Sequence, residues 1–155
     1  MDKTEHSWER MARTPGDVVL AAIDQPESVL GHRPAAGAWA VKEVVCHLRD
    51  VEEFYLIRTQ TILTNEEPRL VLLDPDRWAT DRQYLRNDFT EALDAFRVRR
   101  EETLVLLRSL SPAQLERGAI HPIRGRITIA NIIHSMAKHD DVHLAQIKRA
   151  LRGEP

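Results

Sequence analysis

The sequence predicts an all-α protein, a four-helix bundle with long connections, and three observations carry this prediction. Apolar residues recur at steps of three and four over four long stretches of the chain. Prolines and glycines gather mainly between these stretches, and no internal repeat is visible. The length of 155 residues suits one domain, so we expect residues 1–155 to fold as a single bundle.

The first helical segment is expected over residues 4–24. Thr14 followed by Pro15 has the pattern of an N-cap with proline at the first helical position, which predicts a break or a kink at this point. Residues 25–38 contain two prolines and two glycines with few apolar residues, so they are expected to form a connection.

The second helix is expected over residues 41–64. Its apolar stripe has the spacing of a bundle helix and consists of Val41, Val44, Leu48, Val51 and Tyr55. The following residues, 65–78, include Pro68 and Pro75 and are too many for an ordinary bundle connection. Connections of this length often have a function of their own or cover a pocket.

The second half of the chain is expected to hold two more long helices. One spans residues 81–110, and the other begins at Thr128 and ends near residue 151. Between them, Ser111 and Pro112 begin a short helical turn, and residues 118–126 are expected to be extended or to form a hairpin.

Composition and charge exclude several classes of protein. With 43% apolar and 30% charged residues, the chain is neither disordered nor fibrous, and its net charge of −2 gives no general attraction to nucleic acid. One cysteine cannot form an internal disulfide, and no apolar run reaches the length that spans a bilayer. The N-terminal residues are charged and lack the apolar segment of a signal peptide. We therefore expect a cytoplasmic protein without a nucleic-acid or membrane partner. Arg97, Arg99 and Arg100 are expected on a solvated helix face with intrahelical ion pairs.

Histidines on the apolar faces of two helices predict a metal site. His139 and His143 are four residues apart on the face that carries the apolar residues of the last helix, and His47 shares the inward face of the second helix. The pair alone is a weak signal, because this spacing arises by chance on many helices. Buried imidazoles side by side cannot all be protonated, whereas a divalent ion binds the neutral form of each. Three such ligands would leave a coordination position for water or substrate, as in catalytic zinc sites.

The other histidines are expected to have lesser roles. His134 shares a face with polar residues and is expected to be exposed, as are His6 and His32. His121 lies in the connection before the last helix and is a candidate for the rim of the site.

Two residues beside His47 have alternative interpretations. Asp50 could contact the metal or orient a ligand imidazole, or it could be a solvated helix carboxylate paired with Arg49 or Arg58. Cys46 is rotated away from the histidine face, which favours a packing role over a nucleophilic one.

Two segments resemble the DinB-like (damage-inducible) superfamily. The first is RPAAGAWAVKEVVCHLRDVE at residues 33–52, and the second is GRIT at 125–128 followed by HDDVHLAQI at 139–147. The similarity extends over residues 15–151. Members of this family are four-helix bundles, often homodimers, with a divalent metal held by three histidines. The resemblance places these ligands on the residues that periodicity also selects: His47, His139 and His143.

The sequence departs from the family pattern at two positions. Ala40 replaces the serine that commonly precedes the second helix, so the capping box with Glu43 is incomplete, and we expect a helix start weaker by about 1 kcal/mol. Val142 replaces an imidazole that often precedes the last ligand, which leaves the three histidines intact.

The resemblance also implies a range of functions. Some members transfer a low-molecular-weight thiol, such as bacillithiol or mycothiol, to electrophiles in detoxification or stress response. The first hypothesis is therefore a metal-dependent thiol S-transferase, with hydrolysis by metal-activated water as its nearest variant. The alternative is a metal-binding bundle or interaction protein without turnover. Zinc or nickel is the expected metal, and iron or manganese would also suit imidazole ligands.

Overall fold

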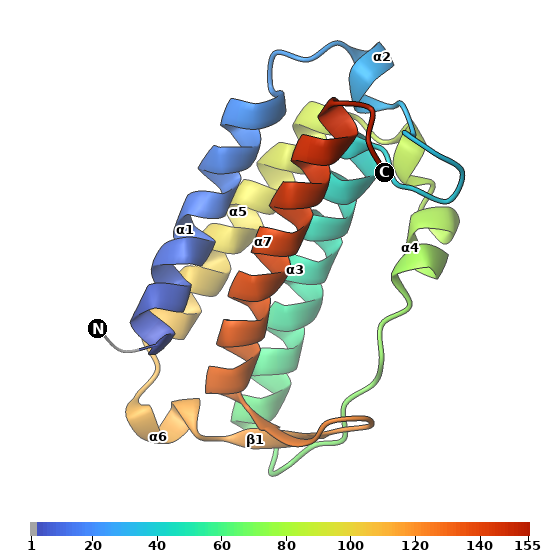
Figure 1. Ribbon diagram of the computed structural model, residues 1–155. Helices are drawn as coiled ribbons and strands as arrows, with labels where there is room; N and C mark the ends of the chain where they lie inside the picture. The colour runs from blue at the N-terminus through green and yellow to red at the C-terminus, as the bar shows by residue number, and fades with distance from the viewer. Residues whose placement is uncertain (1–2) are drawn as a thin grey trace.

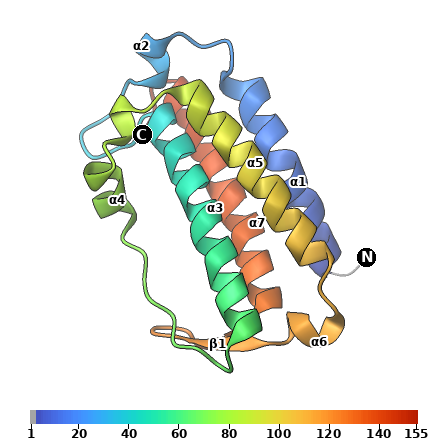
Figure 2. The same cartoon turned by 180° about the vertical axis from the view of Figure 1, so that it is seen from behind.

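Four long helices lie side by side in the computed structural model, which describes residues 3–155 (Figure 1). They are α1 (Lys3–Ala22), α3 (Val41–Thr64), α5 (Phe89–Arg108) and α7 (Ile129–Leu151). Helices α1 and α7 run in one direction, and α3 and α5 run in the other, as the two opposite views show (Figures 1 and 2). Helix α3 packs against α5 and α7, and α1 packs against the same two helices. The predicted four-helix bundle is confirmed.

The parallel arrangement of α3 and α5 explains the long connection between them. Helix α3 has 24 residues and is about 36 Å long at about 1.5 Å per residue. The chain must return over this length before α5 can begin. It does so outside α3, through an extended segment at residues 65–74, helix α4 (Pro75–Asp81) and the 3-10 turn η1 (Tyr84–Arg86) (Figure 2).

Helix α5 begins later than the sequence pattern predicts. We expected a helix from residue 81, but α4 ends at Asp81 and α5 begins at Phe89. The Asp88 side chain accepts a hydrogen bond from the backbone N–H of Glu91 at 2.9 Å and so caps the new helix. The apolar spacing predicted one continuous helix here, but the turn at η1 and this cap interrupt it.

The sequence predicted either a break or a kink at Thr14, and the break is wrong because helix α1 continues through Pro15. A proline inside a helix leaves the carbonyl four residues earlier without its N–H partner, here that of Met11. The Arg100 guanidinium donates to this carbonyl oxygen at 2.7 Å. Thr14 does not cap a helix, and its hydroxyl donates to Asp140 on α7 at 2.8 Å. A side chain from α5 therefore replaces the hydrogen bond that the proline removes.

Short elements close the two ends of the bundle. Helix α2 (Glu27–Leu30) lies in the connection before α3. At the opposite end, α6 (Pro112–Leu115) leads into the predicted hairpin of β1 (Gly118–His121) and β2 (Gly125–Thr128), which pair antiparallel. The backbone of Ile120 in β1 also exchanges hydrogen bonds of 2.9 and 3.0 Å with residues 68 and 70. The hairpin thus holds the start of the crossover.

The start of α3 shows half of a capping box. The carboxylate of Glu43 accepts the backbone N–H of Ala40 at 2.9 Å, while Ala40 offers no side-chain cap. Arg33 pairs with the same carboxylate at 2.5 Å. The incomplete cap expected from the sequence is confirmed, and the ion pair with Arg33 adds a second tie between this end of α3 and the preceding loop.

A polar layer separates the two clusters of buried apolar side chains. One cluster contains the first half of α3 and the end of α7, and the other contains the end of α3 and the start of α7. Between them Arg100 is 3% exposed and pairs with Glu52 at 2.7 Å and with Asp140 at 2.5 Å. The prediction of a solvated arginine face with intrahelical ion pairs is wrong for Arg100. It is also wrong for Arg99, whose side chain is 30% exposed and pairs with Asp50 and Glu53 on α3. It is correct for Arg97, which pairs with Asp94 three residues away.

Within residues 3–155, no helix combines the length and the apolar character needed to cross a membrane.

Candidate metal centre

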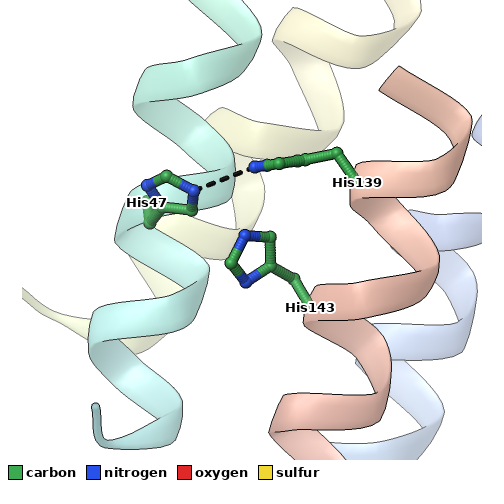
Figure 3. Close-up of side chains that lie close together, drawn as sticks. All are labelled: His47, His139 and His143. Atoms are coloured by element: carbon green, nitrogen blue, oxygen red, sulfur yellow. Dashed lines mark hydrogen bonds between the residues drawn. The ribbon is translucent and has the colours of Figure 1, made fainter. Parts of the chain in front are cut away.

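Three histidines converge between α3 and α7 (Figure 3). His47 projects from α3, and His139 and His143 project from successive turns of α7. One ring nitrogen from each lies within 4.8 Å of the others, and the Nε2 atoms of His47 and His139 are 3.0 Å apart. The structure therefore brings together all three residues that the sequence predicted as ligands.

The protein environment favours neutral imidazoles in this cluster. Burial, followed by the charge of His143, lowers the pKa of His47 to about 3. Burial and the other two histidines lower the pKa of His139 to about 2. Burial also lowers the pKa of His143, against the effect of its hydrogen bond to Gln146. At neutral pH each ring keeps a lone pair, so the donor set fits a divalent ion that prefers nitrogen ligands.

A cavity of about 480 Å³ opens onto the three histidines. Its other walls come from the loop before α3, from α3 and α7, and from the crossover, and they include Trp39, Val51, Tyr55, Leu73, Asp76 and Gln146. The Trp39 ring lies 4.9 Å from that of His47, measured between centroids. The long crossover thus covers a pocket. The mostly apolar lining is typical of small-molecule sites.

Gln146 is a site residue that the sequence analysis did not select. Its Oε1 lies 2.7 Å from Nδ1 of His143, one helical turn earlier on α7. The signal was present in the spacing, because residues three apart on a helix are neighbours. In contrast, Nδ1 of His47 is buried and has no hydrogen-bond partner in the part of the chain that the structure describes.

Asp50 does not orient a ligand imidazole. Its carboxylate is buried and accepts hydrogen bonds from Arg49 at 2.7 Å and Tyr84 at 2.9 Å, and it pairs with Arg82 at 2.8 Å. Burial alone would raise the pKa of Asp50, but the hydrogen bonds from Arg49 and Arg82 hold it below its usual value. Of the two interpretations, the ion pair with Arg49 is the one present in the structure, and it is buried rather than solvated.

His121 does not line the cavity. Its Nδ1 accepts the backbone N–H groups of Ile123 and Arg124, both at 3.2 Å, so the ring stabilises the hairpin turn. The structure thus corrects the expectation of a rim residue. His134 is exposed, as predicted.

Cys46 is buried on a different side of α3 from the cavity. Its Sγ lies 3.9 Å from the carbonyl oxygen of Tyr84. Burial raises the pKa of this thiol to about 11, so it stays protonated at neutral pH. These observations favour the predicted packing role.

A model of one protein family matches residues 8–147, which is most of the chain, and this family is the DinB superfamily. The chain belongs to the DinB superfamily. The match includes α3, the crossover and most of α7, and therefore all three histidines.

The relatives of this DinB protein include two from Oceanobacillus iheyensis whose names give metal-dependent hydrolysis as a proposed activity. OB0413 is 29% identical over 152 residues, which is 94% of this chain and 84% of the relative. OB0782 is 33% identical over 125 residues, 81% of this chain and 72% of the relative. The solved structure of YfiT from Bacillus subtilis matches with a TM-score of 0.89 at 26% identity, covering 96% of this chain and 86% of YfiT. Its description names a proposed metal-dependent hydrolase with an unusual four-helix bundle topology.

Proposed function

We propose that this protein is a metal-dependent enzyme that holds a divalent ion on His47, His139 and His143. The supporting observation is the convergence of three histidine side chains at one cavity. Zinc or nickel suits this ligand set best, and iron or manganese would also bind it. A bound ion would supply Lewis acidity, which lowers the pKa of a thiol or a water molecule in the cavity.

The nucleophile in this proposal comes from outside the chain. Cys46 is buried away from the cavity, and its pKa is raised to about 11. Asp50 is occupied by arginines and Tyr84. Trp39, Tyr55 and the crossover residue Leu73 would surround the apolar part of a substrate and exclude bulk water. A cavity of about 480 Å³ suits small molecules rather than a polymer.

Thiol S-transfer is the first candidate reaction. A small thiol such as bacillithiol would lose its proton and form a bond from sulfur to an electrophilic carbon, whose leaving group departs with the bonding electrons. Hydrolysis is the second candidate, and the names of the relatives favour it. We also propose that the chain acts as a homodimer, as the family resemblance implies, which light scattering of the purified protein would test.

The experiment measures metal content by elemental analysis and then two reactions with and without chelator. Loss of thiol is followed with cysteine or bacillithiol and chlorodinitrobenzene, and release of nitrophenol is followed with nitrophenyl acetate and no thiol. We expect chelator-sensitive thiol loss in the wild type and in His134→Ala, and none in His143→Ala.

The other outcomes each select a different conclusion. Chelator-sensitive nitrophenol release without thiol consumption would select hydrolysis. Bound metal with no turnover in either reaction would favour the non-catalytic bundle. A protein that binds none of the four metals would overturn the proposed function.

A further inference from the structure

Gln146 meets the side of His143 that faces away from the other two histidines. Its Oε1 lies 2.7 Å from Nδ1 of His143. Both side chains are half-buried and line the same cavity. The two residues are three apart on α7, so the helix itself holds them in contact.

This hydrogen bond determines where the imidazole carries its proton. A neutral imidazole has one N–H and one lone pair, and an amide oxygen only accepts hydrogen bonds. With Oε1 facing the ring, the proton lies on Nδ1 and the lone pair lies on Nε2. If the amide turned over, its NH₂ would donate to Nδ1 and the proton would move to Nε2, which would block that nitrogen as a ligand. The amide orientation and the imidazole tautomer are therefore linked.

The other two histidines are held differently. Nε2 of His47 and Nε2 of His139 are hydrogen-bonded to each other at 3.0 Å, which requires a proton on one of them. Nδ1 of His47 has no acceptor among the residues that the structure describes. One ring of this pair must give up or relocate a proton before both Nε2 atoms can bind an ion. His143 needs no such change.

We propose that Gln146 is a positioning residue that holds His143 in the Nδ1–H tautomer and so presents Nε2 of His143 as the preformed ligand. This inference rests on the proposed metal site, because the tautomer matters for function only if the histidines bind an ion. The effect of such outer partners on metal affinity is typically 10- to 100-fold.

The first measurement reads the tautomer in the metal-free protein. Long-range proton–nitrogen NMR of protein labelled with ¹⁵N-histidine distinguishes a protonated from an unprotonated ring nitrogen. We expect Nδ1 of His143 to be protonated before zinc is added and to remain so afterwards. At least one ring of the pair His47 and His139 should change its proton position when zinc is added. A mixture of tautomers at His143 in the metal-free wild type would overturn the proposal.

The second measurement compares zinc affinity among matched variants. Gln146→Met removes the acceptor at nearly constant volume, and Gln146→Glu keeps an acceptor. Lys148→Met is the control on the exposed side of the same helix. We expect Gln146→Met to lose the single tautomer and to bind zinc about 10- to 100-fold more weakly. Gln146→Glu should keep both properties, and Lys148→Met should match the wild type.

The two measurements separate failure of this inference from failure of the proposed function. If the wild type holds the Nδ1–H tautomer but binds no metal, the metal site is wrong and the positioning by Gln146 stands. If zinc binds equally well to the wild type and to a folded Gln146→Met variant, the role of Gln146 is overturned and the metal site stands. Helical circular dichroism of each variant establishes that it is folded.

Discussion

Replacing Arg100 by leucine should destabilise the bundle far more than replacing Arg97 on the same helix. The Arg100 guanidinium is buried between Glu52 and Asp140, which are 2% and 1% exposed. Removing the guanidinium leaves two buried carboxylates without their cation. The Met11 carbonyl also loses its hydrogen bond from Arg100, and Pro15 has no N–H with which to replace it. Breaking a buried ion pair from one side costs about 3–5 kcal/mol. The free energy of unfolding of a domain is about 5–15 kcal/mol, so the variant should be marginally stable.

Urea denaturation followed by circular dichroism measures this loss. With a slope of about 2 kcal/mol per molar urea, a loss of 3–5 kcal/mol moves the midpoint down by about 2 M. Arg97 is 56% exposed and pairs only with Asp94 at 3.5 Å among the described residues. Arg97→Leu should therefore change the free energy of unfolding by at most about 0.5 kcal/mol.

A further variant tests the reason for the loss. Adding Asp140→Asn to Arg100→Leu removes one uncompensated charge and should restore part of the midpoint. The reasoning would be refuted if Arg100→Leu shifted the midpoint no more than Arg97→Leu does.

The histidines and the single cysteine can be tested separately. His143→Ala should abolish cobalt binding, read from its visible spectrum, with unchanged helical circular dichroism, because apolar burial rather than the ion supports the bundle; unfolding of this variant would contradict that view. His134→Ala should bind cobalt as the wild type does. Burial lowers the pKa of His47 to about 3 and that of His139 to about 2 in the folded protein. In the unfolded chain these imidazoles have pKa values of about 6.5, so they take up protons at a higher pH than in the folded protein. The metal-free protein should then lose unfolding free energy between about pH 6.5 and 3, and urea midpoints that stay constant from pH 8 to 4 would argue against neutral buried rings. Native Cys46 should resist dithionitrobenzoate, and Cys46→Ser should leave metal content unchanged; rapid labelling would show that the thiol is accessible.

Much of the fold and the three histidines could be predicted from local spacing. The bounds of α3 agree with its apolar stripe, and α7 begins beside Thr128, whose side chain accepts the backbone N–H of Asn131 at 3.2 Å. The faces of these two helices place His47, His139 and His143 inward whatever the other elements do. An imidazole on an apolar face needs a partner, so the sequence alone was sufficient to propose where a metal would bind.

Tertiary structure decided what periodicity cannot express, namely which distant groups satisfy one another. Arg100 had the spacing of a solvated residue, but its partners Glu52 and Asp140 are 48 and 40 positions away. The same guanidinium lets α1 continue through Pro15, although the local pattern predicted a break or a kink. The crossover became necessary only because α3 and α5 run in the same direction. The spacing of residues along a helix determines on which face of that helix each residue lies. A buried polar group, however, is stabilised only by the partners that packing brings to it from other helices.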